Sequence, residues 1–328
     1  MASLQHWVVF LLLSIFPVVD AGHPDWEHAR FSSPAWLFIK PGAKYQLWPR
    51  STIPLCYDSD ETRDTFHDIL WAAMRLWYAA GLPESFRLLE INRLACIHNP
   101  FESLYVEGTR DVLASDIGMP LISMRSGADQ PEVDKPTIKV FVDRENLGWT
   151  IKSAAHELGH AFGLLHEHQN PSFWGPNGAD KVFRFYCMHL HDFVEITEGM
   201  YEDDVWGQTG VCRDIISAEE IGFSAGDWLP EVATDVFTPH PWWAHDSMVD
   251  WDSIMLYQSF SDSIDEDHIP VLTRWDTSTW ESSWTPSTLD VAGLEAMYES
   301  PWANPMLPFW NDIRSPYFAL FRQFSHCA

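Results

Sequence analysis

The sequence predicts a domain that mixes helices with strands, and three observations support this prediction. Apolar residues recur at helical spacing over about 61–80, whereas the segment 84–143 contains short apolar runs that are typical of strands. A second helix, which we expect to begin near Thr150, follows the last of these runs. With 328 residues, of which 46% are hydrophobic and 14% aromatic, the chain can bury a sizeable core.

The chain begins with two segments that precede this domain. Residues 1–21 are typical of a secretory signal peptide, because the apolar run Trp7 to Val19 is too short to span a bilayer comfortably. We expect cleavage near Ala21 and a mature chain that is secreted and extracellular. Residues 22–47 are expected to form a short pro-segment or an N-terminal arm.

The first strand and the first helix follow directly. The strand is expected within Trp48 to Tyr57, and Ser59 or Asp60 can cap the helix after it. Gly81 ends this helix. Its apolar stripe faces the core and consists of Phe66, Ile69, Leu70, Ala73, Met74 and Trp77. Further strand candidates lie at 86–91, 104–106, 120–124 and 138–142.

Three histidines lie in the second helix and in the turn after it. His156 and His160 are four residues apart, so both imidazoles project from one face of the helix. Gly163 can leave helical geometry through a positive φ and bring His166 back to the same ion. Three protein ligands leave a fourth position for water, as in catalytic zinc sites. We therefore predict one catalytic Zn²⁺ held by these three histidines.

Glu157 follows the first histidine, where it can reach a water on the ion. An ion held by three neutral imidazoles keeps its positive charge, which lowers the pKa of bound water from ~15.7 toward ~7. Glu157 is the candidate general base, and Tyr257 is the candidate donor to the oxyanion. The alternative is a chance occurrence, which is common for a bare His-Glu-x-x-His. The added glycine and third histidine make the longer metzincin signature.

The segment 168–250 is too long for a structureless connection and is expected to fold as an elaborated insertion. It contains a predicted short helical stretch near 180–195. His189 and His191 fit either a second metal pair or ordinary surface histidines. The carboxylates of 202–204 fit either a calcium site or a solvated loop. The second interpretation is favoured in each case.

Five cysteines follow the signal peptide, and an exported protein is expected to bridge them. Nearest-neighbour pairing joins Cys56 with Cys96 and Cys187 with Cys212, and it leaves Cys327 over. The sequence alone does not fix this connectivity. No two of them are close enough for a Cys-x-x-Cys zinc site.

The end of the chain contains a second stretch of candidate site residues at 252–257, a closing helix over about 287–298, and a tail rich in proline and aromatic residues at 300–328. The formal net charge of −27 argues against nucleic acid and anionic membranes as partners. No later stretch is apolar enough for membrane insertion. Protein or peptide substrates are the expected partners, and the oligomeric state is not predicted.

At these residues the sequence resembles the metzincin metalloproteases and, within them, the astacin family. The metzincin resemblance rests on the stretch 156–166 and on Met255 of a Met-turn. The astacin resemblance rests on Glu167 after the third histidine, Ser253 and Tyr257 around Met255, Trp48-Pro49, Ile53-Pro54, and the closing segment 289–298.

The resemblance covers roughly 48–299 and implies a zinc endopeptidase with a two-lobed α+β catalytic domain. The upper lobe would contain a twisted mixed sheet and two long helices, and the irregular lower lobe would contain the Met-turn and the C-terminal helix. By resemblance Tyr257 is a movable ligand and oxyanion stabiliser. Gly163 and Glu167 are structural, and Met255 is a hydrophobic base beneath the zinc.

The sequence departs from the family in four places. The gap from His166 to Met255 is longer than usual, and Leu256 stands where astacins commonly have histidine. The cysteines do not map cleanly onto the family's disulfides. Residues 22–47 lack the Phe-x-Gly-Asp motif, so inhibition by an aspartate on the zinc is not expected.

Two other functions fit parts of the sequence. One is a secreted, non-catalytic interaction protein that retains a vestigial zinc site and binds through its Trp-rich loops. Decayed enzymes usually lose the general base or a ligand, and here all are present. The other is a different metzincin subfamily, but Glu167 and Tyr257 favour astacin.

Overall fold

The computed structural model describes residues 38–39, 45–98, 102–110, 112–120, 135–232, 236–237, 245–266 and 268–299. All of them belong to the unit that spans 34–328. The predicted signal peptide, most of the predicted N-terminal arm, the tail 300–328 and Cys327 lie outside the described residues.

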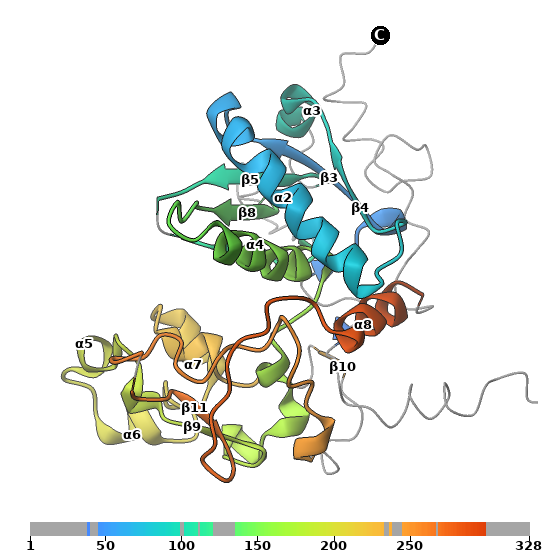
Figure 1. Ribbon diagram of the computed structural model, residues 1–328. Coiled ribbons are helices and arrows are strands. Elements are labelled where there is room, and N and C mark those ends of the chain that lie inside the picture. Colours follow the sequence, from blue (N-terminus) through green and yellow to red (C-terminus); the bar gives the residue numbers. More distant parts are fainter. Residues whose placement is uncertain are drawn as a thin grey trace, which may run out of the picture. The chain divides into compact units, whose positions relative to one another are not determined.

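A five-stranded mixed sheet forms the framework for the histidine motif (Figure 1). β3, β4, β5 and β8 run parallel, and β6 joins the edge antiparallel to β8. In register, Leu55 lies opposite Leu104 and Val106 opposite Ile138. The sheet order is β4 (Arg87–Glu90), β3 (Thr52–Tyr57), β5 (Leu104–Gly108), β8 (Thr137–Val140) and β6 (Ala114–Ser115). The strand candidates at 86–91, 104–106 and 138–142 are therefore confirmed as β4, β5 and β8.

Two long helices, α2 (Asp60–Ala80) and α4 (Leu147–Phe162), run side by side against this sheet (Figure 1). The Ser59 side chain caps α2 by accepting the N–H of Thr62. α4 begins three residues earlier than expected, because the Asn146 side chain accepts the N–H of Trp149 and so starts the helix there. The α+β class, with its mixed sheet and two long helices, is confirmed.

The first hydrophobic core lies between the sheet and these helices. The six residues of the predicted stripe on α2 are all buried in it. Two indole N–H groups tie neighbouring segments to α4, since Trp77 donates to the carbonyl of Ala155 and Trp48 to that of Ala161. The closing helix α8 (Thr288–Glu299) contributes Val291, Leu294 and Met297 to this same core rather than to the irregular part of the chain.

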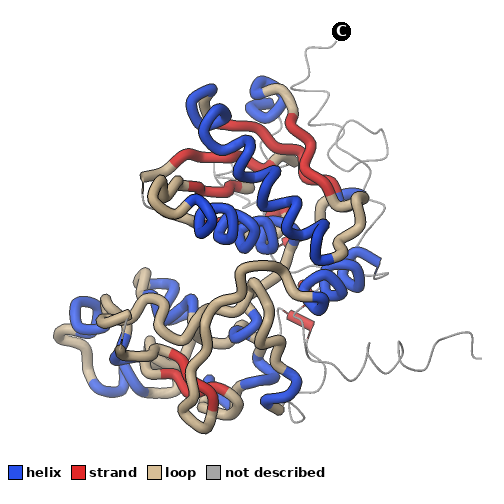
Figure 2. The backbone as a smooth tube through the Cα atoms, in the orientation of Figure 1, coloured by secondary structure: helices blue, strands red, loops and turns tan. Residues whose placement is uncertain are grey.

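A second hydrophobic core is built from residues 173–280, which Figure 2 shows as mostly loops with short elements. Its elements are η3 (Pro171–Phe173), η4 (Pro176–Gly178), β9 (Phe183–Phe185), η5 (Cys187–His189), α5 (Phe193–Thr197), α6 (Glu202–Trp206), α7 (Ile215–Glu220), η6 (Ser224–Asp227), η8 (Asp246–Met248) and β11 (Leu272–Arg274). The expected helical stretch near 180–195 is wrong over β9, because these residues pair antiparallel with β11.

Smaller elements complete the described chain. They are β1 (Phe38–Ile39), which pairs with β10 (Val236–Phe237), β2 (Tyr45–Gln46), which pairs with β7 (Met119–Pro120), η1 (Pro49–Ser51), α3 (Arg93–His98) and η2 (Glu167–Gln169). Of the strand candidate 120–124 only Pro120 is described. Both nearest-neighbour disulfides are confirmed: Cys56–Cys96 joins β3 to α3, and Cys187–Cys212 lies in the second core.

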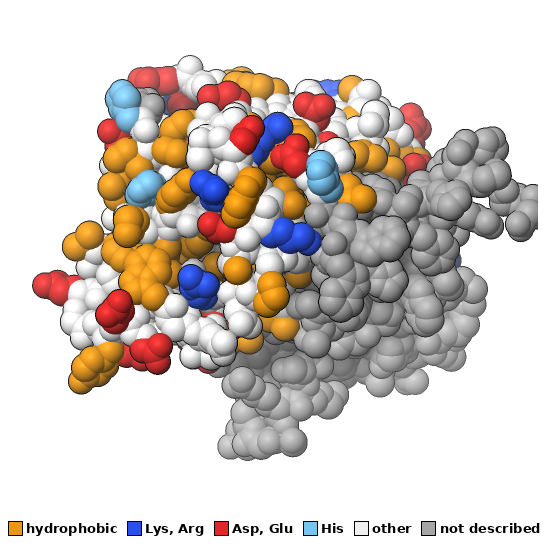
Figure 3. Space-filling model, turned by 90° about the horizontal axis from the view of Figure 1, so that it is seen from below, with side chains coloured by type: hydrophobic (Ala, Val, Ile, Leu, Met, Phe, Trp, Pro, Cys, Tyr) orange, Lys and Arg blue, Asp and Glu red, His pale blue; other side chains and the backbone are white. Residues whose placement is uncertain are grey.

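The face drawn in Figure 3 shows scattered Lys and Arg side chains among acidic and apolar ones, with no continuous basic stripe over its described residues. Within the described ranges, no helix has both the length and the apolar character that crossing a bilayer requires.

Candidate metal site

Helix α4 delivers the first two histidines of the motif from one of its faces. His156 and His160 lie one turn apart, and both side chains are buried. Their ring centroids are 4.8 Å apart, and the rings are nearly perpendicular. The helical spacing of four residues therefore produces the convergence that the sequence predicts.

Gly163 ends α4 and redirects the chain. Its φ of 112° lies in the region that favours glycine, and its N–H donates to the carbonyls of Gly159 and His160. After this turn the chain passes back toward the helix, so that His166 faces the other two histidines. His166 is also buried.

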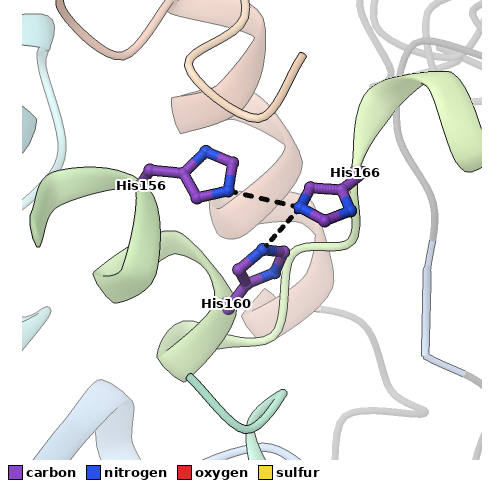
Figure 4. A group of neighbouring side chains, drawn as sticks. All are labelled: His156, His160 and His166. Carbon is purple, nitrogen blue, oxygen red and sulfur yellow. Dashed lines mark hydrogen bonds between the residues drawn. The ribbon is translucent and has the colours of Figure 1, made fainter. Parts of the chain in front are cut away.

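The three imidazoles point toward one another (Figure 4). The Nε2 atom of His166 lies 3.3 Å from Nε2 of His156 and 3.0 Å from Nε2 of His160. The three possible ligand atoms all lie within 4.8 Å of one another, and the three histidines are the group of metal-ligating side chains that the described residues assemble.

The hydrogen bonds at the other ring nitrogens fix where the protons lie. Nδ1 of His156 is 2.7 Å from the carbonyl oxygen of Ile254, and Nδ1 of His160 is 2.8 Å from that of Leu164. Nδ1 of His166 is 2.8 Å from Oε1 of Gln169. Oxygen acceptors of this kind require an N–H, so each neutral ring carries its proton on Nδ1 and leaves the Nε2 lone pair free.

Three converging lone pairs repel one another unless a cation lies among them. A proton could bridge one pair only if one ring were an imidazolium, and burial opposes this charge. Burial lowers the pKa of His160 to about 4 and lowers the pKa values of His156 and His166 well below the ordinary value. Tetrahedral zinc with Zn–N distances of 2.0–2.1 Å places its nitrogens about 3.3 Å apart. The residues therefore fit a zinc ion.

Glu157 lies on α4 beside the first histidine and is 7% exposed. Burial raises the pKa of its carboxyl to about 8, against a smaller opposite effect of Lys152. The charge of Glu157 also contributes to the raised pKa of Tyr257, after burial and Asp227. The carboxyl and the phenol are therefore within electrostatic range of each other.

The ring of Tyr257 packs against two of the histidines. Its centroid lies 4.2 Å from that of His166 and 5.8 Å from that of His156. It also lies 5.1 Å from His168 and 5.3 Å from Trp228. The phenol is thus held at the edge of the histidine group by rings from three segments.

The Met-turn packs beneath α4 at a position where the helix has no side chain. A Cβ added to Gly159 would clash with Sδ of Met255, and it would also crowd Trp77. The carbonyl of Met255 accepts the N–H of Glu167 at 3.1 Å. Met255 therefore contacts both the helix and the segment that carries the third histidine.

A buried carboxylate network holds the Met-turn in place. Glu167 Oε1 accepts the N–H of Asp250. Asp290 accepts the hydroxyl of Ser253 and the N–H of Ile254, whose carbonyl in turn receives the Nδ1 proton of His156. Burial raises the pKa values of all three carboxyls, that of Asp290 to about 6.

Within the described residues, neither His189 and His191 nor the carboxylates of 202–204 belong to a group of three or more converging metal-ligating side chains. Nδ1 of His189 bonds to the carbonyl of Pro270, and Nδ1 of His191 bonds to that of Asp262. The carboxylates of 202–204 form the first turn of α6, where the helix dipole favours negative charge. The histidines and carboxylates are accounted for by these structural roles.

Comparison with solved structures finds distant likenesses. One is high choriolytic enzyme 1, a hatching enzyme zinc-protease from the medaka fish Oryzias latipes, with a TM-score of 0.45 at 13% identity; 78% of this chain and 94% of that chain are covered. Two structures of myroilysin give TM-scores of 0.41 and 0.38 at 13% identity. They cover 78% and 79% of this chain, and 96% and 92% of theirs. No family model and no curated protein matches the chain.

Three residues at the site were not anticipated from the sequence. Gln169 accepts the His166 proton, Gly159 makes room for Met255, and Asp290 supports the Met-turn. Gly159 occupies a position that any residue can take in the motif, so nothing singles it out. Gln169 is anchored by carbonyls 57 and 60 residues away, and Asp290 binds a turn 36 to 37 residues earlier, so local patterns carry no signal for these contacts.

A Gly163→Ala variant tests the turn that delivers His166. Alanine at φ 112° is strained, so we expect a loss of about 1–3 kcal/mol in unfolding free energy together with weaker zinc binding. Gly81→Ala is the matched control, because Gly81 ends α2 with φ 111° and has nothing within 4 Å of an added Cβ. It should lose similar stability and bind zinc normally. Equal zinc affinity of the two variants, measured by chelator competition, would contradict this role.

Proposed function

We propose that this protein is a secreted, zinc-dependent endopeptidase of the metzincin type, similar to the astacins, which hydrolyses peptide bonds in proteins. The observation that carries the proposal is the convergence of three unprotonated Nε2 atoms, two of them from the helix that also carries the buried Glu157. This donor set leaves room for a substrate oxygen or a water, as in catalytic sites.

Zinc in this site would polarise the scissile carbonyl and lower the pKa of a bound water, so that the water could lose a proton and attack near neutral pH. Glu157 accepts the proton of that water and then delivers it to the leaving amine. Burial raises the pKa of its carboxyl to about 8, so its carboxylate is a stronger base than that of an exposed glutamate. Glu157 lies on α4 one residue after a ligand, and its side chain is buried.

Tyr257 stabilises the negative oxygen that develops on the attacked carbonyl. Burial, Asp227 and Glu157 raise the pKa of its phenol well above the usual value, so the hydroxyl keeps its proton and donates a hydrogen bond. Packing against the rings of His166 and His168 orients it.

The disulfides support secretion. Cys56–Cys96 and Cys187–Cys212 belong in an oxidising compartment, as does the signal peptide that the first 21 residues are expected to form. Substrates are then extracellular proteins or peptides. The long segment after His166 is the elaborated insertion of a catalytic domain that spans 48–299.

Removal and return of zinc test the proposal directly. Dialysis against a chelator is expected to lower casein hydrolysis at least ~100-fold, because the lost ion supplies the main electrostatic stabilisation, and one equivalent of Zn²⁺ should restore it. Hydrolysis that survives complete zinc removal would refute the mechanism. A protein that binds one zinc but cleaves neither casein nor a peptide library would instead be the non-catalytic interaction protein.

A further inference from the structure

The side chain of Gln169 lies between the third histidine and a turn almost sixty residues further along the chain. Its Oε1 is 2.8 Å from Nδ1 of His166. Its Nε2 donates to the carbonyl oxygens of Gly226 at 3.1 Å and Leu229 at 3.2 Å. The side chain is buried, and its oxygen and both its amide hydrogens are engaged.

These partners determine the orientation of the amide. A backbone carbonyl can only accept, so the amide nitrogen must face Gly226 and Leu229, and the oxygen must face His166. The reversed amide would place its oxygen against two carbonyl oxygens and its N–H against Nδ1–H. Gln169 therefore holds the proton of His166 on Nδ1 and leaves Nε2 free for an ion.

The turn that supports Gln169 is joined to the ligand segment by two more bonds. Nε2 of His168 donates to the carbonyl of Asp227 at 2.8 Å, and the N–H of Glu231 donates to the carbonyl of Gln169 at 2.9 Å. Residues of this turn belong to the second hydrophobic core. The position of His166 is thus tied to the inserted segment and not only to α4.

The three histidines differ in what receives their Nδ1 protons. His156 and His160 donate to the backbone carbonyls of Ile254 and Leu164, which no substitution removes. His166 alone among them donates to a side chain. Its support can therefore be deleted without altering a ligand.

We propose that Gln169 is a positioning residue for the metal, which fixes the tautomer and ring direction of His166 and connects it to the turn 226–229. This inference rests on the proposed zinc function. Partners of this kind typically contribute 10–100-fold to metal affinity, through the ligand that they orient.

The test is the zinc dissociation constant of the full chain, measured by competition with a chelating dye. Gln169→Met keeps the side-chain length but removes the amide oxygen and both donors, and it should weaken zinc binding about 10–100-fold. Gln169→Glu keeps an acceptor for Nδ1–H but places an oxygen against the carbonyls of Gly226 and Leu229, so its affinity should fall less than that of the methionine variant. Gln208→Met is the control, since Gln208 is exposed, and it should bind as wild type does.

Stability of the zinc-free protein separates positioning from a merely structural role. Both Gln169 variants lose the bonds to Gly226 and Leu229, so both should unfold more easily, whereas the methionine variant should lose clearly more zinc affinity than the glutamate variant. If it does not fold, Gln169→Leu replaces it. Unchanged affinity without the amide, or equal weakening in the glutamate variant, overturns the inference. Failure of the wild-type protein to bind zinc refutes the proposed function instead.

Discussion

Replacing Glu157 by glutamine is expected to leave zinc in place and to lower kcat for peptide hydrolysis by at least ~10³-fold. Glutamine has nearly the same shape, so the buried position on α4 is kept, and the three histidines retain their Nδ1 partners. An amide, however, cannot accept the proton of the attacking water. Zinc content by mass spectrometry and turnover of casein or a quenched peptide measure the two effects separately.

Glu195→Gln is the matched control for this variant, because Glu195 is an exposed glutamate on α5. It makes the same change of charge at the surface and should leave both zinc content and kcat unchanged. If Glu157→Gln digested casein at the parental rate, the general base would have to be another group. If it lost its zinc, Glu157 would be holding the metal site together rather than moving protons.

The parts of the site that follow from local geometry could be predicted from the sequence. The spacing of His156 and His160 places them on one face of any α-helix, and Gly163 takes the positive φ that only glycine adopts readily. The positions of the three histidines are therefore determined within the eleven residues 156–166. The supports of the site could not be predicted, because Gln169 acts through carbonyls 57 and 60 residues away and Asp290 through a turn 36 residues earlier.

The same division applies to the fold. The helix α2 has a cap at Ser59, a continuous apolar stripe and a glycine end, and each signal lies within the helix or beside it. The segment 183–185 has no such signals and becomes a strand because β11, almost ninety residues later, pairs with it. The helix α3 is too short to be stable by its own propensity, and a disulfide joins it to the sheet. Tertiary contacts decide the elements that the sequence leaves ambiguous.

Replacing Asp290 by alanine is expected to have the largest effect on stability, about 4 kcal/mol or more. The buried carboxylate accepts the hydroxyl of Ser253 and the N–H groups of Ile254 and Ser287. Alanine would leave these three donors without an acceptor, and each unsatisfied buried group costs ~1–3 kcal/mol. Because the carbonyl of Ile254 orients His156, zinc should bind more weakly as well. Urea unfolding of zinc-free and zinc-loaded protein measures both losses.

Asp290→Asn should behave very differently and should reveal a pH dependence in the wild-type protein. The asparagine oxygen can accept both N–H groups while its amide donates to the Ser253 hydroxyl, so the network survives. In the wild type, burial raises the pKa of Asp290 from 3.8 to about 6, with a further contribution from Asp250. The folded state therefore binds the proton more tightly than the unfolded state. The contribution of Asp290 to the unfolding free energy is fully present below pH ~4, and about 3 kcal/mol of it is lost as the pH rises through ~6.

This dependence should be measured on zinc-free protein, where protons do not compete with the ion for histidines. Two other carboxyls, those of Asp250 and Glu167, lie near Asp290 and also have raised pKa values. Their titration makes the unfolding free energy fall with pH in both the wild type and the variant. The unfolding free energy of Asp290→Asn relative to wild type should thus increase between pH 4 and pH 7. Parallel curves over this range would mean that Asp290 is already ionised in the folded protein at pH 4, and that its three donors outweigh its burial.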